Sequence, residues 1–301
     1  MCGVVGLLLR DPSLQPRLGE LLVPMIEALD ERGPDSSGIA VYADRPPTEG
    51  PPTLRLSLGA DEAVDWQGLG SSLLEVAASG AELHRFGAGL VLDLPEASLT
   101  AVQERLAAQY PQVRVLGTGW NLRVLKDTGR PTDTCARYGI ASWDGYLAVA
   151  HTRMATESAV TVLHSHPFVP ARDLCVVHNG SFSNYATVRR HLQDDGVRFD
   201  SDNDSEVAAR YLAGRLQFGD DLEEATRWVM KEMDGFFTLV ITSAEEMSVV
   251  RDAFACKPAV VAETPAYVAV ASEYRALAEL PGITDAIVFE PRPEEVYTWS
   301  R

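Results

Sequence analysis

The feature that most constrains this chain is its second residue, Cys2, together with the apolar segment that follows it. Gly3 and the mainly apolar residues 4–9 predict a strand buried in a sheet, which would hold the start of the chain rigidly. A residue as small as cysteine at position 2 allows the initiator methionine to be removed. We therefore expect a mature chain that begins with a fixed cysteine carrying a free α-amine.

A terminal cysteine of this kind can act as a nucleophile that carries its own base. The unperturbed pKa of an α-amine is about 7.7–8.0 and that of a cysteine thiol is about 8.5. Near neutral pH the amine can therefore accept the thiol proton, directly or through a water molecule. The alternative is that Cys2 is an incidental small residue at a frayed end, and the motifs described below favour the nucleophile.

The composition is that of a globular protein with a large excess of acidic groups. Of the 301 residues, 46% are hydrophobic and 23% are charged, which allows one large core or two modest ones. The formal net charge of -17 argues against nucleic acid or an anionic membrane as a partner, because both need a basic surface. The sequence shows neither a secretory signal pattern nor an apolar run of about 18 residues, so we expect a cytoplasmic protein.

The cysteines and histidines give no convincing metal site. Cys2, Cys135, Cys175 and Cys256 lie far apart and form no CxxC pair, which argues against a disulfide framework and a zinc or iron–sulfur centre. We expect reduced thiols, of which the last three are structural. The histidines at 164, 166 and 178 lack a further ligand pattern, and a turn or pocket-shaping role is the better interpretation.

Hydrophobic periodicity predicts two outer parts separated by an insert. In the first part, a helix is expected to begin at Leu18 and to end near Gly33. A short strand is expected after it, at 39–42. Residues 44–140 begin with a Pro-rich linker and predict a small α/β unit. Its helices are expected near 61–79 and 98–109, and its strands near 87–93 and 113–126 with a turn at 117–119. This insert is expected to be structural or to dock a partner.

From residue 146 the pattern of a large core resumes. Strands are predicted at 146–150 and 174–177, and each delivers polar residues where it ends. Helices are expected at 184–193, 204–216 and 222–233, followed by an alternating C-terminal sheet. Polar groups that emerge at strand ends are typical of a functional site.

Asn179 and Gly180 follow the second of these strands and suit an oxyanion hole. An amide side chain and the backbone N–H of an unhindered glycine can converge on one oxygen atom, as a thiol attack on an amide requires. The alternative is an ordinary Asn-Gly turn between strands.

A free amino acid as substrate would also need groups for its carboxylate and its ammonium. Arg153, after the first strand, can supply a guanidinium fork, and Thr156 adds a hydroxyl. Asp204 opens a predicted helix and can hold an amine, although helix capping among the acids at 202–206 is an alternative role.

Six motifs in this order resemble the glutaminase domain of class II glutamine amidotransferases. The resemblance covers roughly residues 2–43 and 140–300, and leaves the insert unmatched. It departs from many family members at Met154, where they carry an aromatic residue, and at Glu157, where several carry histidine. The motifs are Cys2-Gly3-Val4-Val5-Gly6, Arg32-Gly33-Pro34-Asp35-Ser36-Ser37-Gly38, His151-Thr152-Arg153-Met154-Ala155-Thr156, His178-Asn179-Gly180, Asp204-Ser205-Glu206, and Arg251-Asp252 with Lys257-Pro258 and Ala271-Ser272-Glu273.

The resemblance implies an α+β fold, the four-layer αββα sandwich of N-terminal-nucleophile hydrolases, here with a small α/β insert. It implies that Cys2 attacks the glutamine side-chain amide and that Asn179 and Gly180 form the oxyanion hole. Arg153 would bind the substrate carboxylate and Asp204 its amine, and Thr156 and Arg32 complete the expected substrate-binding set. One amidotransferase domain is expected over 2–301, with the insert inside it.

Within this family the chain looks most like the stand-alone amidotransferase subunit of glutamate-synthase-like enzymes, including N-methylglutamate synthase. That resemblance implies a flavin-dependent synthase partner, with FMN and possibly iron–sulfur groups on the partner subunits and neither cofactor nor metal on this chain. Two alternatives stay open at this point. The chain could be a catalytically silent scaffold subunit, or an N-terminal-nucleophile amidohydrolase that acts on another amide.

Overall fold

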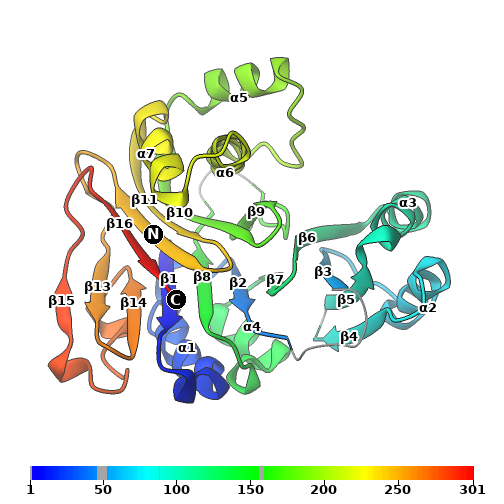
Figure 1. Cartoon of the computed structure of the whole chain (residues 1–301), viewed down its shortest axis with the longest axis horizontal. Coiled ribbons are helices and arrows are strands. Elements are labelled where there is room, and N and C mark those ends of the chain that lie inside the picture. Colours follow the sequence, from blue (N-terminus) through cyan, green and yellow to red (C-terminus); the bar gives the residue numbers. More distant parts are fainter. Residues whose placement is uncertain (1, 46–52, 88, 156–158) are drawn as a thin grey trace.

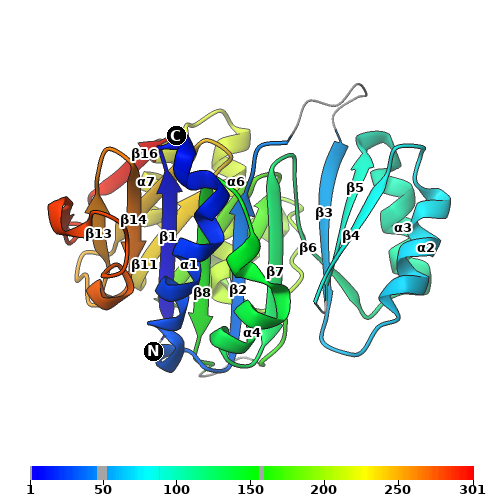
Figure 2. The ribbon, with the colours of Figure 1, turned by 90° about the horizontal axis from the view of Figure 1, so that it is seen from below.

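The computed structural model describes residues 2–45, 53–87, 89–155 and 159–301. Two sheets lie face to face at its centre, and helices cover both outer faces (Figure 1 and Figure 2). The larger sheet has seven strands in the order β15 (Ile287–Phe289), β13 (Val260–Glu263), β14 (Tyr267–Ala271), β1 (Gly3–Leu9), β8 (Leu147–Arg153), β2 (Ser36–Tyr42) and β7 (Leu122–Thr128). The second has five, in the order β16 (Val296–Ser300), β12 (Glu246–Arg251), β11 (Gly235–Thr242), β10 (Leu174–Phe182) and β9 (Phe168–Ala171).

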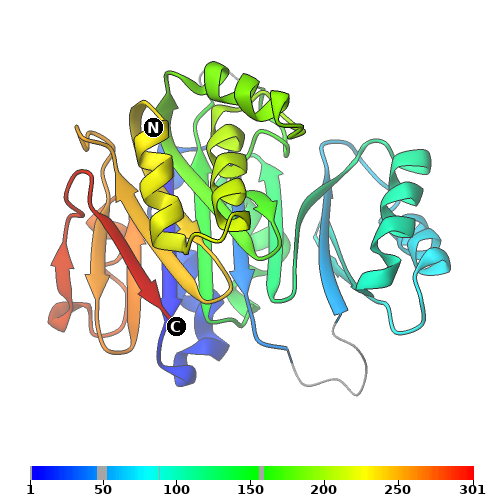
Figure 3. The ribbon, with the colours of Figure 1, turned by 45° about the horizontal axis from the view of Figure 1, so that its top comes forward.

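Helices complete a four-layer arrangement. On the outer face of the larger sheet lie α1 (Leu18–Glu27) and α4 (Pro131–Tyr138), whose apolar residues pack on that sheet. On the outer face of the five-stranded sheet lie α5 (Tyr185–Asp194), α6 (Asp204–Gln217) and α7 (Leu222–Glu232), which stand in front of the strands in Figure 3. The predicted αββα sandwich is confirmed. Short 3-10 helices are η1 (Pro12–Arg17), η2 (Asp30–Arg32), η3 (Glu96–Ser98), η4 (Ile140–Ser142), η5 (Tyr274–Ala276) and η6 (Ile283–Asp285).

The first strand is central to this architecture. β1 pairs with β14 on one side and β8 on the other, and all its residues are buried. Its side chains alternate between two cores: Val5, Leu7 and Leu9 pack beneath α1, whereas Val4 and Leu8 face the five-stranded sheet. The sequence prediction of a buried strand directly after Cys2 is thereby confirmed.

The insert forms a third sheet beside the sandwich. It has four strands in the order β4 (Glu82–Phe86), β5 (Gly89–Pro95), β3 (Thr53–Ala60) and β6 (Val113–Gly119), covered by α2 (Trp66–Val76) and α3 (Leu99–Gln109). Figure 1 shows this unit at one side of the sandwich, next to β7. The strands β3 and β4 were not predicted from the sequence.

The structure divides the predicted segment 44–140 differently from our expectation. The expected pair of strands over 113–126 is present, but its turn lies at Trp120 and Asn121 rather than at 117–119. β6 belongs to the insert, whereas β7 pairs with β2 and so extends the larger sheet. The turn is placed by Asp173, whose carboxylate accepts hydrogen bonds from the backbone N–H groups of Trp120, Asn121 and Leu122. No helix among the described residues is long and apolar enough to cross a membrane.

Candidate functional site

The backbone of Cys2 is fixed by residues from distant parts of the chain. Its carbonyl oxygen accepts hydrogen bonds from Arg32 Nε at 3.0 Å and from Asn179 Nδ2 at 3.3 Å. Two residues later, the N–H of Val4 donates to Ser272 Oγ at 2.9 Å. A thiol carried by such a backbone cannot move far, which is the condition for a positioned nucleophile.

The Cys2 side chain opens into a cavity of about 530 Å³. Its Sγ contacts the carbonyl oxygen of Met154 at 3.7 Å, at the end of β8. The cavity is built from the ends of β1, β8 and β10 and the start of α6. The described residues that line it are Cys2, Arg153, Met154, His166, His178, Asn179, Gly180, Ser181, Tyr185, Asp202, Asn203, Asp204, Ser205 and Lys257.

Asn179 and Gly180 lie together at the end of β10, in the wall of this cavity. Asn179 is buried, with its side chain directed to Cys2 through the hydrogen bond given above. Gly180 has a φ of 152°, and a Cβ there would lie 1.9 Å from the Phe236 carbonyl oxygen, so only glycine fits. Both residues belong to paired strands rather than to a tight turn, since they lie opposite Thr238 and Phe237 of β11.

The two expected substrate-binding charges face the same cavity. Arg153 is 4% exposed, and burial lowers its pKa while the Cys2 and Asp35 side chains act in the opposite direction. Its Nη1 donates to the Ala159 carbonyl oxygen at 3.0 Å. The Arg153 guanidinium and the Asp204 carboxylate therefore lie in the same cavity as the Cys2 thiol, as recognition of a zwitterion requires.

Asp204 is held at the start of α6 in a fixed orientation. Its Oδ2 accepts from the Phe182 N–H at 2.9 Å, and its Oδ1 accepts from Ser205 Oγ at 3.1 Å. The helix cap itself is Asn203, whose side chain accepts from the Ser205 N–H. The capping role that we had considered for the acids of this segment is thus filled by a neutral neighbour.

Histidines surround the cavity without forming a metal centre. His178 Nδ1 lies 2.7 Å from Ser205 Oγ, and burial lowers the pKa of this imidazole. His164 Nε2 lies 2.7 Å from Asp202 Oδ1, on a more exposed part of the rim. Across the described residues, no group of three or more His, Cys, Asp or Glu side chains is arranged to hold a metal ion.

One of the expected substrate-binding residues, Arg32, is not among the described residues that line the cavity. Arg32 lies behind Cys2, where it contacts the Cys2 carbonyl oxygen and pairs with Glu273, and it is not among the lining residues. We therefore expect Arg32 to position the nucleophile rather than to contact the substrate. Thr156 and Glu157 lie outside the described residues.

Sequence reasoning missed several lining residues, notably Lys257, Tyr185 and Asn203. Lys257 was noted only as part of a motif. Its backbone carbonyl oxygen accepts from Thr238 Oγ1 and Arg251 Nε, which fixes the loop beside the cavity. An argument from the motif Arg251…Lys257 could have suggested this loop, whereas Tyr185 carries no local signal.

Comparison with known proteins agrees with this geometry. A family described as "Glutamine amidotransferase domain" matches residues 151–279. The "Glutamine amidotransferase-like protein GlxB" of Rhizobium meliloti is 44% identical over 299 residues, covering 99% of this chain and 98% of the relative. A glutamine–fructose-6-phosphate aminotransferase of Zymomonas mobilis is 42% identical over 97 residues, which cover 32% of this chain and 16% of that protein.

Solved structures resemble the fold over the whole chain. The glutamine phosphoribosylpyrophosphate amidotransferase from B. subtilis gives a TM-score of 0.62 at 16% identity, covering 100% of this chain and 49% of that one. A structure titled as the allosteric regulatory enzyme of purine biosynthesis gives 0.64, also at 16% identity, covering 99% and 46%. This chain spans about half the length of both structures. On the full-length relative and this fold, the chain belongs to the class II glutamine amidotransferases.

Proposed function

We propose that this chain hydrolyses the side-chain amide of glutamine through a thioester on Cys2 and supplies the ammonia to a partner synthase. The observation that carries the proposal is the convergence of Cys2, Asn179, Gly180, Arg153 and Asp204 on one cavity. These residues come from segments far apart in the sequence.

The chemistry follows from the roles of these groups. After removal of Met1, the α-amine of Cys2 accepts the thiol proton, and the thiolate attacks the amide carbon. Asn179 Nδ2 and the Gly180 N–H stabilise the oxyanion that forms. The C–N bond then breaks, ammonia leaves with the proton, and water hydrolyses the thioester to glutamate.

Substrate selection rests on the two charged residues of the cavity. Arg153 binds the α-carboxylate and Asp204 the α-ammonium of glutamine, while the amide reaches Cys2. This pair favours a free amino acid over the amide of a peptide, and therefore disfavours the amidohydrolase alternative. An intact nucleophile and oxyanion pair likewise disfavour a silent scaffold subunit.

The acceptor belongs to a partner subunit. We propose a flavin-dependent synthase of the glutamate-synthase or N-methylglutamate-synthase type, with FMN and any iron–sulfur group on that partner. The support is the resemblance of the HTRMATES and VVHNGSFSN segments to the stand-alone subunits of such enzymes. We further propose a cytoplasmic complex.

The test is the intact mass of the protein before and after a glutamine-mimicking diazo-ketone, with mapping of the labelled peptide. We expect a chain without Met1 that carries a single adduct on Cys2, and no adduct on a Cys2→Ala variant. A Cys256→Ser variant, which lacks an exposed thiol, should label like the wild type. Retention of Met1, or Cys2→Ala protein that supports glutamine-dependent synthesis at the wild-type rate, would favour the scaffold alternative.

A further inference from the structure

Three side chains form a hydrogen-bonded row in the wall of the Cys2 cavity. His178 Nδ1 lies 2.7 Å from Ser205 Oγ, and Ser205 Oγ lies 3.1 Å from Asp204 Oδ1. The direct distance from His178 Nδ1 to Asp204 Oδ1 is 3.9 Å, so the serine hydroxyl bridges the two groups. His178 and Ser205 are buried, whereas the Asp204 side chain is 21% exposed. The row therefore connects a buried imidazole to the acid that we assign to the substrate amine.

The chemistry of the three groups fixes the direction of both hydrogen bonds. An ionised carboxylate can only accept, so Ser205 Oγ donates its single hydrogen to Asp204. The hydroxyl must then accept from His178, which requires a proton on Nδ1 of the imidazole. Burial lowers the pKa of His178, with Lys257 acting in the same direction and Asp204 against it, so the ring is neutral near neutral pH. His178 Nε2, which has no hydrogen-bond partner among the described residues, is then left without a proton to donate.

β10 places this imidazole on the other face of the strand from the proposed oxyanion donor. His178 and Asn179 are neighbours on β10, so their side chains leave the strand in opposite directions. Asn179 reaches the Cys2 carbonyl oxygen, whereas His178 reaches the start of α6. The Phe182 ring stacks on the imidazole, with centroids 4.3 Å apart and an angle of 21° between the planes. The donor at Nδ1 is thus held in place by packing as well as by its hydrogen bond.

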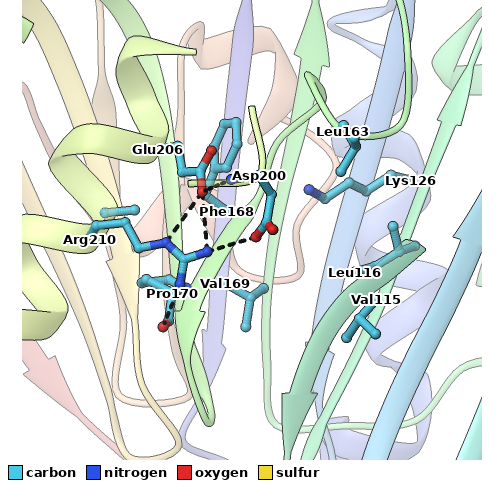
Figure 4. A pocket seen from close by; sticks show the side chains of 11 residues that line it. Val115, Leu116, Lys126, Leu163, Phe168, Val169, Pro170, Asp200, Glu206 and Arg210 are labelled. Carbon is cyan, nitrogen blue, oxygen red and sulfur yellow. Dashed lines mark hydrogen bonds and ion pairs between the residues drawn. The ribbon is translucent and has the colours of Figure 1, made fainter. Parts of the chain in front are cut away.

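The backbone at the start of α6 is fixed independently of the row. Glu206 Oε1 accepts a hydrogen bond from the Asp200 N–H at 2.9 Å, which ties the first turn of the helix to the loop before it. Arg210, one turn further along α6, pairs with both Asp200 and Glu206 (Figure 4). Removing the Ser205 hydroxyl should therefore release the Asp204 side chain without displacing the helix.

We infer that His178 is a positioning residue that orients the Asp204 carboxylate through Ser205, and that this row sets the selectivity of the cavity for a substrate with a free α-ammonium. The inference rests on the proposed function, in which Asp204 binds that ammonium. Among the described residues, each Asp204 oxygen has one hydrogen-bond donor, Ser205 Oγ for Oδ1 and the Phe182 N–H for Oδ2. A carboxylate oxygen can accept two hydrogen bonds, so each keeps capacity for an ammonium N–H. Without the serine donor, the carboxylate can rotate away from the orientation that meets the ligand.

The test compares L-glutamine with glutaramate, which has the same carboxylate and amide but lacks the α-amine. We expect Ser205→Ala to raise KM for glutamine about tenfold, at the lower end of the range for a hydrogen bond to a charged group, with kcat within about twofold. For glutaramate, kcat/KM should change by less than about twofold. Ser183→Ala is the matched control, since that hydroxyl binds the Asp234 carbonyl oxygen and Ser183 is not among the described residues that line the cavity.

Two substitutions of His178 separate positioning from packing. His178→Asn keeps a side-chain donor near the place of Nδ1 but loses the ring, whereas His178→Phe keeps a ring against Phe182 but has no donor. We expect His178→Phe to lower the ratio of the two kcat/KM values, glutamine over glutaramate, about tenfold, and His178→Asn to keep it within about threefold. The reverse order would overturn the inference. So would an equal loss of activity towards both substrates in Ser205→Ala and His178→Phe, because the row would then only support packing.

The protonation of the ring gives a readout that does not depend on turnover. In protein labelled with ¹⁵N at histidine, the His178 signals are identified by their absence from the spectrum of His178→Asn. We expect a proton on Nδ1 and none on Nε2 near neutral pH. A proton on Nε2 alone would reverse the hydrogen bond to Ser205 and overturn the inference.

Binding to Cys2→Ala protein separates failure of this inference from failure of the proposed glutaminase. Titration calorimetry gives Kd for glutamine and for glutaramate, with and without the additional Ser205→Ala substitution. We expect that substitution to weaken glutamine binding about tenfold and to leave glutaramate binding unchanged. Equal effects on the two ligands would overturn the inference even if the wild type hydrolyses glutamine. A selective loss of glutamine binding, in a protein whose wild type makes no glutamate, would instead support the row and count against the proposed function alone.

Discussion

Arg32 Nε lies 3.0 Å from the carbonyl oxygen of Cys2 and holds the nucleophile from behind. The same guanidinium pairs through Nη1 with Glu273, just after β14, and Glu273 also pairs with Arg275. The backbone beside the thiol is thus held by charged residues that are not among the described residues lining the cavity.

Replacing Arg32 by alanine should therefore lower kcat and leave KM nearly unchanged. Loss of a hydrogen bond from a charged donor is worth about 1.5–3 kcal/mol, which corresponds to a fall in kcat of about 10- to 100-fold. Steady-state glutamate production measures both constants. Arg17→Ala, which removes only the exposed pair with Glu20, is the control. A higher KM with unchanged kcat would return Arg32 to the substrate-binding group.

Asn179→Ala should reduce kcat by about 10²- to 10³-fold, the usual cost of one oxyanion donor. KM for glutamine should change little, because the donor acts on the charge that develops during attack. The measurement is single-turnover thioester formation. Asn184→Ala is the control, since that side chain binds the Glu232 carbonyl oxygen away from the cavity. Equal rates for Asn179→Ala and the wild type would remove Asn179 from the oxyanion hole.

Arg153→Ala should raise KM for glutamine about 10- to 100-fold, as expected for loss of a charge-assisted hydrogen bond to the substrate carboxylate. Thermal unfolding of the variant serves as the check on its folding. Glutaminamide, which lacks the carboxylate, should be used about equally well by the variant and the wild type. An unchanged KM for glutamine would contradict the assignment.

Asp173→Ala should destabilise the fold by about 3 kcal/mol, because three backbone N–H groups, one buried and two partly buried, would lose their common acceptor. Denaturant unfolding measures the change in free energy. Asp194→Ala, at the exposed end of α5, matches the change in charge and should have little effect. Equal midpoints for the two variants would show that the β6–β7 turn is held by other contacts.

The stability of the protein should fall as the pH is lowered from about 6.5. His151 has a folded-state pKa of about 3, whereas an unfolded histidine titrates near 6.5. Between these values the unfolded chain binds a proton that the folded chain does not, so protonation favours unfolding by up to about 1.4 kcal/mol per pH unit. In His151→Phe the fall in free energy of unfolding between pH 6.5 and 5 should be shallower than in the wild type. His84→Gln, at a more exposed histidine, is the control. A slope in His151→Phe identical to that of the wild type would contradict this prediction.

Much of the sandwich could be predicted because its core strands are short, apolar and bounded by polar motifs. β1, β8 and β10 all show this pattern. The limits of the insert could not be predicted, because β7 joins the larger sheet through pairs such as Lys126 with Gly38, which lie far apart in the sequence. β3 was missed although its residues alternate in polarity, because it follows a Pro-rich linker.

Part of the candidate site, too, could be anticipated from the sequence, and part could not. Cys2, Asn179, Gly180, Arg153 and Asp204 each belong to a local motif, and the structure brings all five to one cavity, while their roles stay predictions. Arg32 was assigned to the substrate because the sequence cannot show that Glu273 lies 241 residues away on its other side. A turn or pocket-shaping role was expected for His166, which lines the Cys2 cavity. The sequence could not show that its ring nitrogens would be buried without a partner among the described residues.

The central place of β1 also sets when activity can first arise during synthesis. β1 lies between β8 and β14, so its pairing waits for residues 147–153 and 267–271 to be translated. Val4 depends on Ser272 as well. The thiol of Cys2 can therefore be fixed in place only after residue 272 has been made.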